Sequence, residues 1–212
     1  MAIVMSKLFT LQDFEIHRII KDLEVTGATS VELLSEYFRL GLLQEAQSYP
    51  YTPEPEVVGT GNQVVRHQFG LFVDFPAFTH YSRLKDAFQT LINAHLGALK
   101  AYPFASQLDF NSMMLQKYDL GSIGITSHRD PLSYINLVCL FNIGGSGRFY
   151  LCDDRSGSNA RVIDSSPGSV IFLRAPGFLN SPERPFHYFT DIHCTCYLFG
   201  LRQKAMPSQV PS

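Results

Sequence analysis

Apolar side chains in the first hundred residues recur mainly at helical spacing. The segment 29–32 has the spacing of a capping box, and apolar positions then follow a helical period as far as Leu42, which predicts a helix beginning there. The proline-rich stretch 50–55 ends that helix, and a strand-like segment over 63–72 follows. A second helix is predicted from about 81 to 99, with its apolar residues on one face.

From Ser112 onward, short β-rich runs alternate with Gly, Pro, Asp and Ser. The predicted strands cover 113–118, 124–128, 134–142, 148–152, 161–164, 169–174 and 194–202. Strands this short, with turns such as 144–147, are typical of a sandwich or barrel rather than of a βαβ fold. Helices first and strands afterwards predict an α+β protein, in which N-terminal helices pack on one side of a jelly-roll, or cupin-like, core.

The chain of 212 residues has a length that suits one well-packed domain. Neither an internal repeat nor a long linker divides it, so a single domain over 1–203 is predicted, with its β-rich core at about 112–203. The tail over 204–212, which carries Pro207 and Pro211, is predicted to be disordered.

Composition narrows the classes of function. The formal net charge is -2 and the sequence pI is about 6.4, so the overall charge does not support a basic face that binds nucleic acid. A local basic patch is still compatible with this overall charge. No run approaches the roughly 20 apolar residues of a membrane helix, and no secretory signal precedes the four cysteines, which predicts a cytoplasmic protein with reduced thiols. Cys194 and Cys196 are predicted to point the same way, as small core side chains rather than metal ligands.

The candidate chemistry begins with His128 and Asp130, which lie where a predicted strand meets Pro131. Residues two apart on a strand point to the same side, so this imidazole and carboxylate can converge on one ion. The third ligand stays open at this point between His187 and His193. Two histidines and one carboxylate form a facial triad, which suits Fe(II) because three coordination positions remain free.

The two-residue spacing is by itself a weak signal, because a surface turn with a His–Asp hydrogen bond gives the same pattern. Three features of the context favour a metal site. The motif lies at the start of the β-rich region, a second histidine follows near its end, and a strand with Arg202 comes after that histidine. The sequence therefore predicts a metal centre built on the β-rich core.

Several segments resemble the AlkB family of oxygenases in their order and spacing. They are 114–121 (MLQKYDLG) leading into 127–130 (SHRD), then 168–173 (GSVIFL) followed by Arg184 and His187, and upstream 65–72 (VRHQFGLF). The first looks like the family's Asn-x-Tyr-x-x-Gly approach to its His-x-Asp motif, and the last resembles the strand before its nucleotide-recognition lid. The likeness extends from about 60 to 203. Within it, His187 fits the distal histidine better than His193, because an arginine and an aromatic residue precede it.

The resemblance implies a double-stranded β-helix that holds Fe(II) through His128, Asp130 and His187, with 2-oxoglutarate and O2 as co-substrates. Tyr118 and Gln116 would face 2-oxoglutarate, although the family prefers Asn where Gln116 stands. It further implies a dioxygenase that hydroxylates a C–H bond and releases succinate and CO2. On an N-alkylated nucleobase, such a hydroxylation ends in oxidative demethylation with release of formaldehyde.

One departure from the family concerns the arginines that grip 2-oxoglutarate, which the family places six positions apart on one strand. If Arg202 is the second of them, Cys196 takes the place of the first, and a bidentate carboxylate contact is lost. If the hairpin after His187 is shortened, Arg202 is itself the first and the second is missing. In both registers Arg202 is the predicted anchor, and the missing cation implies weak affinity for 2-oxoglutarate or a different oxo-acid.

The substrate is the least determined part of the prediction. An aromatic substrate pocket is one interpretation of Phe69, Phe72, Phe75, Phe78 and Tyr81, and core packing is the other. The absence of Lys and Arg clusters keeps a small metabolite or a protein side chain beside the nucleobase as candidates. Two alternatives differ in kind: a degenerate β-helix that binds a ligand without turnover, and a cupin-like protein that binds Zn or Mn.

Overall fold

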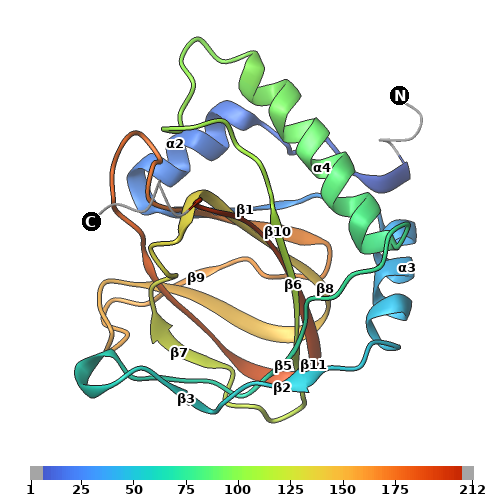
Figure 1. The fold of residues 1–212 in the computed structure, drawn as a ribbon, viewed down its shortest axis with the longest axis vertical. Coiled ribbons are helices and arrows are strands. Elements are labelled where there is room, and N and C mark those ends of the chain that lie inside the picture. Colours follow the sequence, from blue (N-terminus) through green and yellow to red (C-terminus); the bar gives the residue numbers. More distant parts are fainter. Residues whose placement is uncertain (1–6, 207–212) are drawn as a thin grey trace.

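The computed structural model of the chain describes residues 7–206 (Figure 1). Its helices and strands are α2 (Ile16–Thr26), β1 (Ala28–Glu32), α3 (Glu36–Ala46), β2 (Thr52–Pro53), β3 (Val57–Val58), β4 (Val65–Arg66), β5 (Gly70–Phe72), α4 (His80–Gly97), β6 (Ser112–Tyr118), β7 (Ile125–His128), β8 (Tyr134–Cys152), β9 (Arg161–Ile163), β10 (Ser169–Arg174) and β11 (Phe186–Lys204), with a short 3-10 turn over Gly61–Gln63. None of the helices it describes is both long enough and apolar enough to cross a membrane.

Nine of the strands form one antiparallel sheet that curls on itself, and β3 and β4 form a separate two-stranded sheet (Figure 1). The order of the nine-stranded sheet is β1-β10-β8-β11-β6-β5-β2, with β7 paired to β11 and β9 paired to β8 away from this path. The two longest strands, β8 and β11, have 19 residues each and pair along most of their length. One half of each belongs to the layer with β10 and β6, and the other half belongs to the layer with β9 and β7. This is the predicted α+β architecture with a double-stranded β-helix core.

The helices cover one face of this sheet, as predicted, and the main hydrophobic core lies between the helices and that face (Figure 1). Phe88 of α4 is fully buried at its centre. Its ring lies 5.0 Å from the ring of Phe141 on β8, 6.2 Å from Phe172 on β10 and 5.7 Å from Phe110. Aromatic contacts of this kind stabilise beyond the area that they bury, so α4 is held firmly on the sheet.

A second, smaller core fills the inside of the β-helix. Its members are buried side chains from both halves of β8 and β11 and from neighbouring strands, among them Tyr118, Val138, Leu140, Phe149, Leu151, Ile171, Leu173, Phe189, Cys196 and Leu198. Along β11 the even-numbered residues 196 and 198 belong to this inner core, whereas 197, 199 and 201 belong to the core under the helices. The alternation follows from the two-residue period of a strand and places Arg202 on the inner side.

The predicted start of the first helix is wrong. Residues 28–32 form β1, an edge strand that pairs with β10, and the helix α3 begins only at Glu36. Its N-cap is Ser35, whose hydroxyl accepts a hydrogen bond from the amide of Phe38 at 3.3 Å. The free edge of β10 offers backbone partners to Thr29 and its neighbours, and this pairing prevails over the local capping-box spacing.

The predicted turn at 144–147 is also wrong, because β8 continues through it without a break. A Cβ at Gly145 would overlap Cys196, and one at Gly147 would overlap the Phe189 ring, so these glycines let β8 pass close to β11. The strand-like segment 63–72 divides into β4 and β5.

Three further sequence predictions concern the second helix, the paired cysteines and the tail. The second helix, α4, agrees with its prediction to within two residues at each end. Cys194 and Cys196 do not point the same way: Cys194 is exposed and Cys196 is buried, since the pairing register of β11 shifts on both sides of Cys194. The predicted tail overlaps β11 at Lys204, and 207–212 lie outside the described residues.

Candidate active site

His128 and His187 are brought together by strand pairing. His128 is the last residue of β7, and it lies directly opposite His187 of β11 in the antiparallel register. Gly124 precedes β7 with a φ of 75°, and a Cβ at that position would overlap the backbone oxygen of Phe189. Only glycine allows β7 to approach β11 this closely, so this glycine helps to set the distance between the two imidazoles.

Asp130 completes a group of three potential metal ligands with these histidines. One donor atom from each side chain lies within 4.8 Å of the other two, a spacing at which all three can reach a single ion. Nε2 of His187 lies 4.0 Å from Oδ2 of Asp130, and the two imidazole ring centroids are 4.4 Å apart. His193, the alternative third ligand in the sequence, is exposed and is not part of this group.

Hydrogen bonds to the backbone fix which nitrogen of each imidazole is free. Nδ1 of His128 lies 2.9 Å from the carbonyl oxygen of Thr126, and Nδ1 of His187 lies 3.2 Å from that of Pro185. A carbonyl can only accept, so each Nδ1 carries the proton and donates it, which leaves the lone pair on Nε2. This is the arrangement that a ligating histidine uses to orient its ring toward a metal.

The electrostatics of the three side chains favour the protonation states that metal binding needs. Burial, reinforced by the adjacent His187, lowers the pKa of His128 to about 3, and burial also lowers the pKa of His187. Burial alone raises the pKa of Asp130, but attraction from His187 and then Arg202 outweighs it, so its pKa lies below the usual value. The site therefore presents two neutral imidazoles and one carboxylate at neutral pH.

We expect the metal-free protein to lose stability as the pH falls below about 6.5, because an unfolded histidine then takes up a proton that folded His128 excludes until about pH 3. A folded-state pKa below the unfolded one contributes stability above the unfolded pKa, and that stability is lost on acidification. The loss for His128 alone should reach about 2 kcal/mol at about pH 5. Urea unfolding at about pH 7.5 and about pH 5 measures it. The His128→Asn variant should lose less free energy of unfolding between these two pH values than wild type does. An equal loss would contradict the assignment of this pH dependence to His128.

The three residues predicted to face a co-substrate, Arg202, Tyr118 and Gln116, fall on the inner side of the β-helix. Arg202 is only 5% exposed, and its Nε and Nη1 are buried without a hydrogen-bond partner. Its guanidinium carbon lies 5.3 Å from the ring centroid of Tyr134. A Cβ at Gly200 would overlap Nη1 of Arg202, so this glycine leaves room for the guanidinium over β11. A buried cation without a partner is costly, and a carboxylate would satisfy it.

Tyr118 and Gln116 differ in how closely they approach this interior. Tyr118 is buried, and its ring lies 5.2 Å from Phe69 and 5.1 Å from Phe189. Burial raises the pKa of Tyr118 far above its ordinary value, so its hydroxyl keeps its proton and can donate to a carboxylate. Gln116 is half-buried on the same strand, two residues away.

Cys196 shares the inner face with Arg202, as both registers require. Its side chain is fully buried, and burial raises its pKa to about 12. The thiol is therefore neutral and cannot act as a second cation. Arg148 does not take its place, because it is exposed and faces Asp191 at 3.8 Å.

Three side chains that support the triad were not assigned these roles from the sequence. The guanidinium of Arg184 donates to the backbone oxygen of Asp130. The ring of Phe149 stacks on His187 with centroids 5.4 Å apart, and Tyr134 packs on Arg202. In the sequence, Arg184 stood out only as part of a family pattern. The other two contacts join residues far apart in the chain, which no local spacing reveals.

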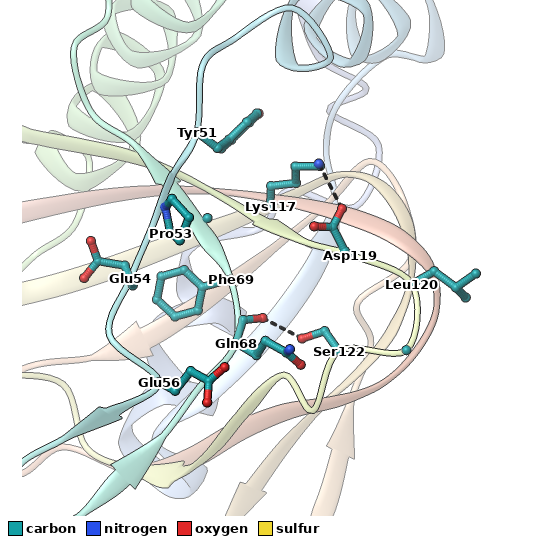
Figure 2. Close-up of a pocket in the computed structure, with 12 residues that line it drawn as sticks. Tyr51, Pro53, Glu54, Glu56, Gln68, Phe69, Lys117, Asp119, Leu120 and Ser122 are labelled. Carbon is teal, nitrogen blue, oxygen red and sulfur yellow. Dashed lines mark hydrogen bonds and ion pairs between the residues drawn. The ribbon is translucent and has the colours of Figure 1, made fainter.

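A cleft of about 390 Å³ lies outside the β-helix, next to β2, β5 and β6 (Figure 2). Phe69 lines it, together with Glu54, Glu56 and Asp119, and Lys117 pairs with Asp119 at 2.9 Å. The walls thus carry more acidic than basic side chains. Of the five aromatic residues predicted to line a pocket or the core, Phe72, Phe75 and Tyr81 pack in or against the main core, whereas Phe78 is fully exposed.

Comparisons with known proteins place this fold. No family model and no curated protein sequence matches the chain. Among solved structures, a Pseudomonas putida prolyl-4-hydroxylase has a TM-score of 0.62 at 12% identity, over 91% of this chain and 100% of that one. A prolyl hydroxylase from Trichoplax adhaerens, in complex with a hypoxia-inducible factor peptide, has a TM-score of 0.63 at 13% identity, over 89% and 88%. OsALKBH1 has a TM-score of 0.56 at 14% identity, over 84% and 98%.

The chain therefore has the fold of the 2-oxoglutarate and iron(II)-dependent oxygenases. A member of that family from Burkholderia pseudomallei also matches, with a TM-score of 0.55 at 16% identity, over 90% of this chain and 92% of that one. The likeness to AlkB proteins inferred from the sequence is confirmed at the level of the fold. Identities this low carry the fold alone, and any activity has to be argued from the site.

Proposed function

We propose that this protein is a non-haem Fe(II)- and 2-oxoglutarate-dependent dioxygenase that hydroxylates a C–H bond. The observation that carries the proposal is the group formed by His128, Asp130 and His187, with both Nε2 atoms free to bind and an unpartnered buried Arg202 on the inner side of the same β-helix. A facial triad beside a buried cation is what iron and an oxo-acid require together.

The residues of the chain fit both groups. The three side chains would hold Fe(II) on one face, and their low pKa values keep protons from competing for the same atoms. Arg202 would pair with a carboxylate of 2-oxoglutarate, with Tyr118 as a neutral hydrogen-bond donor nearby. Bound iron and 2-oxoglutarate supply the oxidising chemistry, with succinate and CO2 as products. The protein positions the substrate and excludes water.

The choice of substrate is a finer proposal. An AlkB-type reaction would place an N-methyl group of a nucleobase-like substrate at the iron, where hydroxylation leads to demethylation. The acidic walls of the cleft in Figure 2 and the net charge of -2 do not favour a nucleic-acid strand there. A small molecule or a protein side chain is the better fit for these charges, and the neighbour with a bound peptide belongs to the same fold.

A non-catalytic ligand-binding protein is the second candidate, because Cys196 stands where a second cation would bind 2-oxoglutarate. Succinate formation in the absence of a substrate separates the two functions. If the protein is a dioxygenase, wild type forms succinate slowly and His128→Ala forms none. If it is a binding protein, neither of them forms succinate.

The proposal is tested by titrating 2-oxoglutarate into anaerobic protein loaded with Fe(II). We expect a weak visible charge-transfer band in wild type and none in Asp130→Ala, because loss of one carboxylate from three ligands should reduce iron affinity by about 100-fold or more. Arg148→Ala, an exposed change on β8, serves as the matched control and should keep the band. Iron that stays bound in wild type without any band on adding 2-oxoglutarate would exclude this co-substrate.

A further inference from the structure

A second cavity, of about 560 Å³, is rich in arginine and is lined by residues that flank the triad in the sequence. The arginines that line it are Arg129, Arg161, Arg174 and Arg184. None of the three metal ligands lines it, but the guanidinium of Arg184 in its wall donates to the backbone oxygen of Asp130. Phe186 forms another part of its wall and immediately precedes His187. A ligand in this cavity would therefore lie against the two chain segments that carry the metal ligands.

Most of this positive charge has no counter-ion within the protein. Of the two carboxylates in the wall, Glu183 pairs with Arg174 at 2.7 Å, and Asp153 accepts a hydrogen bond from Asn159 at 2.7 Å. Within residues 7–206, no carboxylate lies within 4.0 Å of a guanidinium nitrogen of the other three arginines. Arg129 and Arg161, both exposed, are therefore free to bind an anion, whereas Arg184 is already engaged by the backbone oxygen of Asp130.

Arg129 is also held in place, and Arg155, which does not line the cavity, lies near it. The guanidinium of Arg129 stacks over the Phe186 ring at 4.1 Å, and that of Arg155 lies 5.7 Å from the same ring. Nη1 of Arg155 is buried without a hydrogen-bond partner. Like charges packed this closely oppose one another, and a bound anion would relieve that repulsion.

The rest of the molecule shows that this charge is local. The chain carries a net charge of -2, and the cleft in Figure 2 is lined by Glu54, Glu56 and Asp119. The volume of the arginine-lined cavity falls in the range of small-molecule sites. Planar guanidinium groups bind carboxylate and phosphate oxygens in pairs. The features favour one compact anionic group rather than a long polyanion.

We propose that the arginine-lined cavity binds a carboxylate or phosphate group of the substrate that is oxidised at the triad. The inference that the bound molecule is a substrate rests on the proposed function, whereas the inference of an anion site rests on the arginines alone. Anchoring one charged end beside Asp130 would fix which C–H bond of the molecule faces the metal.

The anion site is tested on metal-free protein, titrated with inorganic phosphate and separately with malonate by calorimetry. We expect one site per chain. Arg129→Gln and Arg161→Gln should each weaken binding by about tenfold or more, because each removes charge-assisted hydrogen bonds. Arg66→Gln, an exposed change on β4 outside the cavity, should leave binding unchanged. The anion that binds more tightly shows whether the site prefers a phosphate or a carboxylate group.

Proximity to the triad is tested by loading the protein with Mn²⁺ and recording the ³¹P signal of phosphate. Paramagnetic broadening of this signal should appear in wild type and be weaker in Arg129→Gln. Asp130→Ala, which lacks one metal ligand, gives the broadening that does not depend on Mn²⁺ at the triad. Absence of phosphate and malonate binding, or equal weakening by Arg66→Gln, would overturn the anion site. Binding without broadening would overturn its link to the substrate. The metal-free titration is independent of iron and 2-oxoglutarate, so failure of the proposed oxygenase activity would leave its result standing.

Discussion

Arg202→Leu is expected to weaken 2-oxoglutarate binding by about 100-fold or more while the protein still folds and binds iron. The change removes the buried cation on the inner side of the β-helix, and two charge-assisted hydrogen bonds account for a loss of this size. The stability of the metal-free protein should not fall, because an unpartnered buried guanidinium is replaced by an apolar side chain. Titration of the charge-transfer band measures the affinity, and urea unfolding measures the stability.

Two controls separate the anchoring role of Arg202 from its packing. Arg148→Leu makes the same replacement at an exposed position of β8 and should leave the band unchanged. Arg202→Lys keeps the charge but loses the paired geometry, so it should recover only part of the affinity. If Arg202→Leu binds 2-oxoglutarate as tightly as wild type, another group anchors the co-substrate, and Arg202 does not face it from the inner side of β11.

Phe88→Ala should lower the free energy of unfolding by about 3–5 kcal/mol, a large fraction of the stability of a single domain. The ring is fully buried and contacts aromatic rings on β8, on β10 and in the segment before β6. Its removal leaves a cavity between α4 and the sheet that these strands cannot close, because they are fixed by their own hydrogen bonds. Equilibrium unfolding in urea at neutral pH gives the free energy directly.

The matched control is Tyr37→Ala, which truncates an aromatic residue on α3 that is 85% exposed. It should change the free energy of unfolding by no more than about 0.5 kcal/mol. A loss for Phe88→Ala below about 1 kcal/mol would mean that α4 is not held to the sheet by this contact.

The sequence was sufficient for the class of fold and for its β-rich region, and the reason is physical. The strands from β6 to β11 are β-rich runs bounded by Gly, Pro, Asp and Ser, and α4 has an apolar face along its length. Local patterns failed where tertiary pairing decides the structure. The capping-box spacing at 29–32 was overridden by the edge of β10, and the glycines at 144–147 serve close strand packing rather than a turn.

The candidate site shows the same division. His128 and Asp130 were found because a spacing of two is a local property of a strand, whereas the choice of His187 over His193 depended on a resemblance. The simple count of faces holds from Cys196 to Arg202, where β11 pairs with β6 without a shift, but it fails for Cys194, because the register of β11 shifts on both sides of that residue. The unpaired arginines beside the triad gave no sequence signal, because they come from segments far apart in the chain.

The continuity of β8 and β11 has a consequence for how the protein could be dissected. One half of each strand contributes alternate residues to the core under the helices and to the inside of the β-helix, the other half contributes to the inside alone, and β11 carries both His187 and Arg202. A cut within either strand would leave neither piece with a complete core. No fragment could then keep the metal ligands without the helical half, so metal binding and the integrity of the whole chain should be lost together.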